Sequence, residues 1–253
     1  MPRILKTVVP RIRRSLAERG LLVSLRRSVL LPIHLFQEYR KAKKHNTVQV
    51  RSDFDRDHDV DTDGEIDGWT HLSDLNIPSA NWIYGRNYAP IDPVRFHAVL
   101  ASIEIRFEDF VFIDFGSGKG RALLMASEYP FRRVVGIEFS PELHLVAQRN
   151  IENFGDRRRK CGPLESVCMD FVDFSPPDEA SVLFFFDPCE DAILIELLRN
   201  IHRSLEQHPR SAYLVYVAPT ASKKVLLDDA DWLIQRRVNE EFRFCVYQAR
   251  QGH

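Results

Sequence analysis

The sequence predicts an α/β protein built on an open, mostly parallel β-sheet. From residue 110 onward, short apolar segments typical of strands alternate with amphipathic segments typical of helices. A glycine-rich loop directly follows the first strand-like segment, where such sheets commonly bind a ligand. The last two strand-like segments are separated by only three residues, which permits a hairpin but not a parallel crossover. The sheet is therefore expected to end in an antiparallel pair.

The elements follow one another in a regular order. Runs of apolar, β-branched and aromatic residues predict strands, and apolar residues spaced three and four apart predict helices. The expected strands are 110–114, 133–139, 165–169, 181–187, 212–217, 232–238 and 242–249. The expected helices are 93–103, 120–129, 141–154 and 191–205. The segment 165–169 is the weakest of the strands.

Charge divides the chain into three parts. With 253 residues and 44% hydrophobic residues, the chain can bury the core of one large domain that carries an extension. Residues 1–44 carry +10, which leaves −11 for the remainder because the formal net charge is −1. We therefore expect a basic helical extension at 1–50, an acidic loop and connecting segment at 51–84, and the α/β domain at 85–253.

The basic arm, residues 1–44, has apolar patches that Arg26 and Arg27 interrupt. No run approaches the roughly 20 residues that cross a bilayer, so no transmembrane segment is expected. The arm would pack on the domain, or contact an anionic membrane surface, a protein or a nucleic acid. Its arginine-rich, acid-poor character would also suit an organellar transit peptide in a eukaryotic source.

The four cysteines give no sign of a metal site or a disulfide framework. They form no CxxC pair and have no histidines at zinc-ligand spacing. This pattern suits a reducing compartment and predicts a cytoplasmic protein with no structural metal.

The acidic stretch 53–67 partly matches a calcium-binding loop. Asp59, Asp61, Asp63 and Gly64 fall on positions of the EF-hand pattern, but the position of its final glutamate is Thr70. The favoured interpretation is an exposed acidic loop that docks on the basic arm.

The glycine-rich loop, IDFGSGKGR at 113–121, is compatible at first with three ligands. A nucleoside triphosphate loop needs a hydroxyl after its lysine, but Gly120 follows Lys119. A dinucleotide loop needs a third glycine where Arg121 stands. Both alternatives are therefore disfavoured.

Asp114 favours S-adenosylmethionine as the ligand. Its carboxylate, two residues before Gly116 at the end of the first strand, would repel a pyrophosphate and attract the ammonium of a methionine group. The glycines at 116, 118 and 120 would let the backbone approach the ligand closely. Glu138, at the end of the second strand, suits ribose hydroxyls in either an adenosyl or a dinucleotide site.

The motifs DFGSGKG and GIE resemble the first and second motifs of class I S-adenosylmethionine-dependent methyltransferases. The resemblance covers roughly residues 85–250. It implies a Rossmann-like three-layer fold with a mostly parallel seven-stranded sheet and an antiparallel C-terminal hairpin. The stretches FDRDHDVDTDGEI, LSDLNIPSANWIYG and NYAPIDP also resemble a bacterial group of such proteins whose substrates are not assigned.

The resemblance also implies a set of cofactor-binding residues. The ribose hydroxyls would contact Glu138 beside Phe139, and the adenine amine would contact Asp170, with Met169 and Phe171 beside the ring; Asp170 could instead cap a helix. Tyr88 would close the pocket or serve as a packing residue. The residues expected around the methionine portion are Asp114, Phe115, Gly116, Ser117, Gly118 and Gly120.

The fourth strand ends in Asp187-Pro188-Cys189-Glu190, on the expected substrate side of the crevice. Amino-group methyltransferases of this fold often carry [DNS]-P-P-[YFW] here, and this chain departs from that pattern at Cys189 and Glu190. Asp187 is the candidate catalytic residue, which would orient a nucleophile or take its proton, or else cap the next helix. No histidine has a sequence relation that predicts a Cys189–His pair.

These features predict a methyltransferase that acts on a nitrogen or oxygen nucleophile of an unidentified acceptor. A small molecule or a protein side chain is expected ahead of a nucleic acid. One alternative is an S-adenosylmethionine-binding regulator or scaffold without turnover. Another is an NAD-dependent oxidoreductase.

Overall fold

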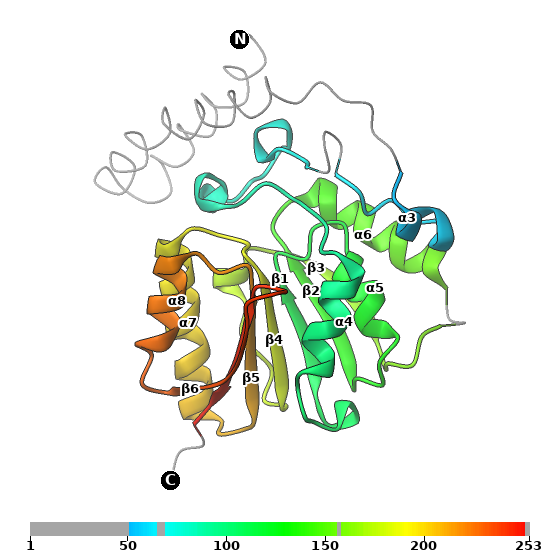
Figure 1. The fold of residues 1–253 in the computed structure, drawn as a ribbon. Helices are drawn as coiled ribbons and strands as arrows, with labels where there is room; N and C mark the ends of the chain where they lie inside the picture. Colours follow the sequence, from blue (N-terminus) through cyan, green and yellow to red (C-terminus); the bar gives the residue numbers. More distant parts are fainter. Residues whose placement is uncertain (1–50, 65–68, 156–157, 251–253) are drawn as a thin grey trace.

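Residues 51–64, 69–155 and 158–250 are described by a computed structural model of the chain, in which a central sheet carries helices on both faces (Figure 1). The expectations for the basic arm, residues 1–44, lie outside the described residues. None of the helices in the described part is long and apolar enough to cross a membrane.

The sheet has seven strands in the order β3-β2-β1-β4-β5-β7-β6. The first five strands by number pair in parallel, and β7 pairs antiparallel with both β5 and β6. The predicted fold class is therefore confirmed, including the antiparallel end of the sheet. The strands are β1 (Val111–Phe115), β2 (Arg133–Glu138), β3 (Leu164–Cys168), β4 (Ser181–Phe186), β5 (Ala212–Val217), β6 (Leu233–Asn239) and β7 (Phe244–Ala249).

The helices match the predicted positions, with additions. Helix α8 was not predicted, because its run of two lysines and two leucines is short; Thr220 caps its first turn. The α-helices are α3 (Asp53–His58), α4 (Pro93–Ala101), α5 (Arg121–Ser127), α6 (Pro141–Phe154), α7 (Asp191–Gln207) and α8 (Ala221–Asp228). Short 3-10 helices are η1 (Leu72–Asp74), η2 (Ala80–Tyr84), η3 (Phe107–Asp109) and η4 (Phe171–Asp173).

Two apolar layers enclose the sheet because the central strands are buried on both faces. On one face, Phe112 and Phe184 pack with α4 and α5; Phe96 of α4 lies edge-on to Phe184, with ring centroids 5.6 Å apart. On the other face, Phe115 and Phe185 pack with α7. Strand β1 is buried along its whole length, as expected of a central parallel strand.

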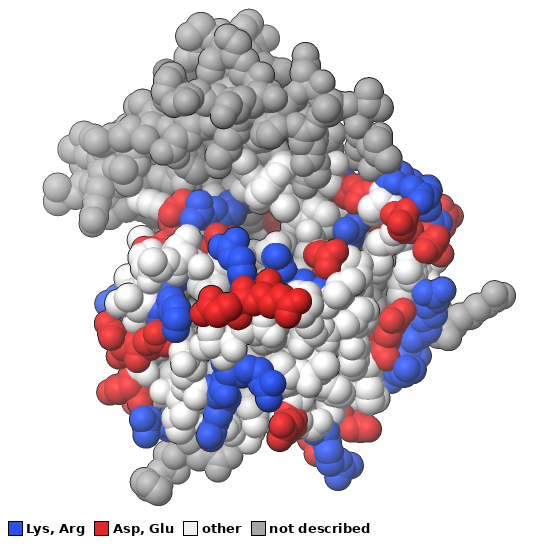
Figure 2. Space-filling view, in the orientation of Figure 1, with Lys and Arg blue, Asp and Glu red and all other residues white. Residues whose placement is uncertain are grey.

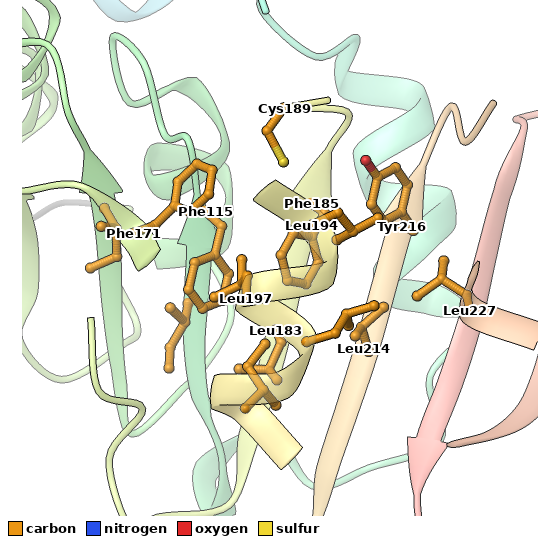
Figure 3. Packing of buried hydrophobic residues seen from close by; sticks show 14 of the residues in the cluster. Phe115, Phe171, Leu183, Phe185, Cys189, Leu194, Leu197, Leu214, Tyr216 and Leu227 are labelled. Carbon is orange, nitrogen blue, oxygen red and sulfur yellow. The ribbon is translucent and has the colours of Figure 1, made fainter. Parts of the chain in front are cut away.

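An aromatic row crosses this second face at the carboxyl ends of three neighbouring strands. The rings of Phe115 and Phe185 stack with centroids 4.8 Å apart, and those of Phe185 and Tyr216 with centroids 5.7 Å apart. Figure 3 shows the three side chains from β1, β4 and β5 among the leucines of α7. The row ends at the Tyr216 hydroxyl, which reaches Asp187.

The prediction of an exposed acidic loop is wrong in part for residues 51–64, which we call the acidic strap, because only four of its acids are exposed: Asp53, Asp57, Asp59 and Asp61. Ser52 caps the short helix α3, and Asp55, Thr62 and Asp63 are buried. The strap packs on the glycine loop and α5, since Asp55 and Asp63 both contact Arg121. The sequence alone could not reveal this, because the basic partners lie about sixty residues further along the chain.

Candidate functional site

A cavity of about 670 Å³ lies at the carboxyl ends of the parallel strands, within the size range of small-molecule sites. Of the predicted site residues, eight line it: Tyr88, Asp114, Gly116, Ser117, Glu138, Phe139, Phe171 and Asp187. Four others, Phe115, Gly118, Gly120 and Asp170, do not line it but lie directly behind residues that do.

The glycine loop needs its glycines for two physical reasons. Gly116, Gly118 and Gly120 have φ values of 82°, 56° and 88°, in the left-handed region that favours glycine. A Cβ at Gly118 would also lie 2.1 Å from the Tyr88 ring. The predicted close approach at Gly118 is therefore to the chain's own tyrosine.

We expect Gly118→Ala to lower the free energy of unfolding by about 2–4 kcal/mol, from left-handed strain together with overpacking. Gly155→Ala is the matched control, because Gly155 also has a positive φ of 65° but its added Cβ would meet only one carbonyl oxygen, at 3.9 Å. The control carries backbone strain without the clash, because its φ of 65° and ψ of −177° also favour glycine, and it should lose less than Gly118→Ala, about 1–2 kcal/mol, in urea unfolding. Equal losses in the two variants would contradict the packing of Tyr88 on Gly118.

Two carboxyl groups stand side by side at the ends of β1 and β2. Asp114 and Glu138 are each about 3% exposed. Burial raises the pKa of Asp114 to about 8, with the nearby Glu138 charge adding to the rise. Burial also raises the pKa of Glu138 to about 7, against hydrogen bonds that favour its charged form.

These two carboxyl groups differ in their partners. Glu138 accepts hydrogen bonds from the backbone N–H groups of Gly118 and Ser140, both at 2.8 Å. Among the described residues, no donor contacts the Asp114 carboxyl group, although it is buried. A buried carboxyl that faces a cavity without a donor is suited to a cationic ligand group.

The acidic strap holds the glycine loop from the side opposite the strands. The ammonium of Lys119 donates to Asp61 Oδ1 at 3.0 Å and to the Asp63 carbonyl at 2.8 Å. Arg121 donates to Asp55 at 3.1 Å and to Asp63 at 2.7 Å. Asp61 and Asp63, which fall on the calcium-binding pattern, and Asp55, which precedes it, thus bind basic residues of the glycine loop.

Tyr88 connects the strap to the cavity. Its hydroxyl donates to the Thr62 carbonyl oxygen at 2.5 Å, and its backbone pairs with Thr70. Burial raises the pKa of Tyr88 well above its ordinary value. Tyr88 therefore lines the cavity and packs as an aromatic anchor, while its role in closing a cofactor pocket stays a prediction.

Phe115 and Asp170 do not line the cavity but contact residues around it. Phe115 belongs to the buried aromatic row rather than to the cavity wall. Asp170 accepts hydrogen bonds from the Ser79 hydroxyl at 2.5 Å and the Asn81 amide at 2.7 Å, and it caps η4 through the Val172 N–H. The helix-cap alternative for Asp170 is therefore present in the structure, with an added tie to the connecting segment.

Asp187 lies in a strained and crowded position at the end of β4. Its φ is 41°, which is unusual for a residue other than glycine. Its Oδ1 accepts hydrogen bonds from Tyr216 at 3.1 Å and from Lys223, whose ammonium is fully buried. Arg86 Nε lies 3.7 Å from its Oδ2. Asp187 does not cap α7, since the residue at the cap position is Glu190.

Cys189 follows this turn and is buried. Its backbone pairs with Gly85, and burial raises the pKa of its thiol to about 12. The thiol is therefore protonated near neutral pH, as expected of a packed cysteine.

Sequence reasoning missed four basic or polar residues of this site: Arg95, Tyr216, Lys223 and Arg243. Lys223 gave no signal because it stands beside Lys224 in an ordinary polar run. Arg95 and Arg243 come from α4 and from the β6–β7 turn, which only the folded chain brings to one cavity.

No protein-family model matches this chain, and no curated protein matches it. Some solved structures are similar to part of it. One is the mitomycin 7-O-methyltransferase MmcR, with 16% identity and a TM-score of 0.46 over 63% of this chain and 54% of that one. This chain thus spans about half the length of that enzyme.

Another similar structure is an RNA methyltransferase from Salinibacter ruber in complex with S-adenosyl-L-homocysteine, with 20% identity and a TM-score of 0.44 over 64% of this chain and 92% of that one. A third is a TehB-like SAM-dependent methyltransferase from Corynebacterium glutamicum, with 15% identity and a TM-score of 0.44 over 62% of this chain and 88% of that one.

Proposed function

We propose that this chain is an S-adenosylmethionine-dependent methyltransferase that transfers a methyl group to a nitrogen or oxygen nucleophile of an unidentified acceptor. The observation that carries the proposal is the buried, donor-free carboxyl of Asp114 at the end of β1, beside Glu138 at the end of β2. We also propose a cytoplasmic location, from the cysteine pattern.

The residues present fit the cofactor. The Asp114 carboxylate would bind the methionine ammonium, which supplies the positive charge that this carboxyl lacks. Glu138 keeps accepting capacity for a ribose hydroxyl, because a carboxylate can accept about four hydrogen bonds and the backbone of Gly118, Phe139 and Ser140 uses three. Phe139 and Phe171 offer apolar surface to the remainder of the ligand.

The cofactor, when bound, supplies an activated methyl group on a sulfonium centre. The chain's contribution is to hold the acceptor in line with it, and alignment of this kind can lower a barrier by several kcal/mol. Pro188 stands beside the loop, since a Cβ on Gly116 would lie 2.7 Å from the Pro188 ring. The turn at 187–188 is therefore next to the place where methionine would lie.

Asp187 would position the acceptor side of the cavity. We expect Asp187→Asn to lower the rate of methyl transfer by roughly tenfold to a hundredfold, because Asp187 fixes both Lys223 and Arg86. Affinity for S-adenosylhomocysteine should change by less than about threefold. Calorimetry together with transfer assays separates the two effects, and unchanged transfer would remove Asp187 from the mechanism.

The affinity for S-adenosylhomocysteine should rise with pH between pH 6 and pH 8. Asp114, with a pKa of about 8, is largely protonated at pH 6 and gains its charge as the pH rises, so it attracts the ammonium more strongly. We expect a gain of about tenfold or more in calorimetric titrations at constant ionic strength. An affinity that is flat or falls over this range would contradict the role of Asp114.

Titration with S-adenosylhomocysteine and with NAD tests the cofactor directly. We expect saturable binding of the adenosyl compound alone; binding of NAD alone would establish the oxidoreductase alternative.

Turnover is tested with cell extract. The extract is incubated with methyl-labelled cofactor and the protein, and is then fractionated into proteins, nucleic acids and small molecules. Tight binding without labelled product would favour the regulator or scaffold.

A further inference from the structure

We propose that the methyl acceptor is a small molecule with an anionic group, a carboxylate or a phosphate, and that Arg95 and Arg243 bind this group. That the bound anion is the methyl acceptor rests on the proposed function. That the cavity binds an anion is argued independently, from the positions, partners and charges of the two arginines.

Arg95 reaches the cavity from the first turn of α4, where it is one of the lining residues. Its position is fixed by the neighbouring Phe96, which is fully buried and packs edge-on against Phe184 of β4. Phe184 lines the same cavity. Arg95 therefore borders the acceptor side, on the face of the sheet that α4 covers.

Arg243 reaches the cavity from the turn between β6 and β7. Its carbonyl accepts a hydrogen bond from Ala218 N–H at 2.7 Å, and both residues line the cavity. Arg243 and Ala218 have φ values of 51° and 56°, which cost on the order of 1 kcal/mol each outside glycine. Two strained residues joined by a hydrogen bond hold the base of the Arg243 side chain next to the end of β5.

Acids lie near both arginines in the chain, Asp92 at the cap of α4 and Glu240 and Glu241 before Arg243, but neither guanidinium contacts one among the described residues. Among the described residues, neither side chain has an ion pair or hydrogen bond. Arg86, the third arginine of the cavity wall outside the glycine loop, differs because it contacts Asp187 and Glu190. The free guanidinium groups of Arg95 and Arg243 match the forked geometry that carboxylates and phosphates accept.

The lining of the cavity therefore carries charges of both signs. The buried carboxyl groups of Asp114 and Glu138 stand at the ends of β1 and β2, whereas Arg95 and Arg243 come from α4 and the β6–β7 turn. A cationic acceptor would meet two unpaired guanidinium groups there, and an anionic acceptor would neutralise them.

A small anion fits better than a nucleic acid. Figure 2 shows Lys and Arg interspersed with Asp and Glu on the face shown, without a continuous basic track. Arg95 and Arg243 instead line the cavity of about 670 Å³, where Arg95 is half-buried and Arg243 is exposed.

The test uses simple probes of the anionic group. The full chain, with and without saturating S-adenosylhomocysteine, is titrated by calorimetry with phenyl phosphate, benzoate and neutral phenol. We expect one or both anions to bind and phenol to bind at least about tenfold more weakly. The anion that binds more tightly shows whether the acceptor carries a phosphate or a carboxylate. Arg95→Gln and Arg243→Gln should each weaken anion binding by roughly tenfold, about one charged hydrogen bond.

Arg237→Gln is the matched control, because Arg237 is an exposed arginine of the same hairpin that does not line the cavity. It should leave anion binding unchanged. Arg95→Gln and Arg243→Gln should also leave S-adenosylhomocysteine affinity within about threefold, which separates an acceptor site from one for the cofactor's own carboxylate. Melting temperatures check that each variant is folded.

Several results would overturn the inference. These are equal binding of phenol and the anions, anion binding that survives both substitutions, a large loss of cofactor affinity in them, or methyl label recovered in the protein or nucleic-acid fraction of the extract. If S-adenosylhomocysteine fails to bind while the anions still bind through Arg95 and Arg243, the proposed function fails and the anion site stands.

Discussion

Replacing Asp114 by asparagine is expected to abolish cofactor binding while making the free protein more stable. At pH 8 the affinity for S-adenosylhomocysteine should fall by at least about a hundredfold, because the variant cannot supply the charge that binds the ammonium. Calorimetry measures this directly. A buried charge that lowers the stability of the free protein is expected where a site binds a ligand group of opposite charge.

The stability change follows from the raised pKa of Asp114. The folded chain holds the Asp114 proton more tightly than the unfolded chain does, so this contribution is fully present below about pH 4 and is lost as the pH rises through about 8. Asparagine does not ionise and keeps its neutral form throughout. The variant should therefore gain about 5 kcal/mol over the wild type at pH 8, and little at pH 4.

Asp109→Asn provides the control, because the Asp109 side chain is largely exposed and pairs only with Arg106. It should change the free energy of unfolding by less than about 0.5 kcal/mol at either pH. Wild-type affinity in Asp114→Asn would remove the main support for the proposed function. A loss of stability at pH 8 would show that the carboxyl has a partner in the folded state.

Replacing Arg121 by alanine should cause the largest loss of stability. The substitution leaves Asp55 and Asp63 without their shared cation in a buried position, and it removes the hydrogen bond to Thr62 at 2.6 Å. Breaking one side of a buried pair costs about 3–5 kcal/mol. For a chain of this size the melting temperature should fall by roughly 10 °C. Scanning calorimetry and urea unfolding measure both quantities.

An exposed pair in the same strap serves as the comparison. Arg56 contacts Asp53 at the surface, so Arg56→Ala should cost no more than about 0.5 kcal/mol. Arg121→Ala combined with Asp55→Asn should lose less than the sum of the two single changes, because the partners are coupled. A cost below about 1 kcal/mol for Arg121→Ala would mean that the strap does not depend on its buried ion pairs.

The fold could be predicted to a large extent because its signals are local. The alternation of apolar strands such as β1 with amphipathic helices is visible in short windows of sequence. The hairpin of β6 and β7 followed from the length of one connection. Helix α8 was missed because eight residues with a partly polar face carry little periodic signal.

The candidate site could be predicted only in part. Asp114 and Glu138 were found because a carboxylate at the end of an apolar strand is conspicuous, and both do line the cavity. Their cofactor-binding roles stay predictions. The hydrogen-bond partners of Asp187, by contrast, include residues of β5 and α8, and nothing in the local sequence ties Tyr216 or Lys223 to it.

The acidic strap shows a second limit of sequence reasoning. A run of aspartates normally indicates a solvated segment, and the expectation of an exposed loop followed from that rule. The rule fails here because Arg121 and Lys119, far along the chain, are themselves buried and require acidic partners. A charged residue is buried only together with its partner, so neither the aspartates nor the basic residues alone predict the burial.

The same long separation orders events during synthesis. Asp61 leaves the ribosome before Lys119, and the two are 58 residues apart. Tyr88, which contacts the strap at Thr62, follows it by only 26 residues, but at ordinary translation rates Asp61 waits roughly 3–12 seconds for Lys119. The segment made earliest among the described residues therefore cannot complete its ion pairs until the glycine loop has been made.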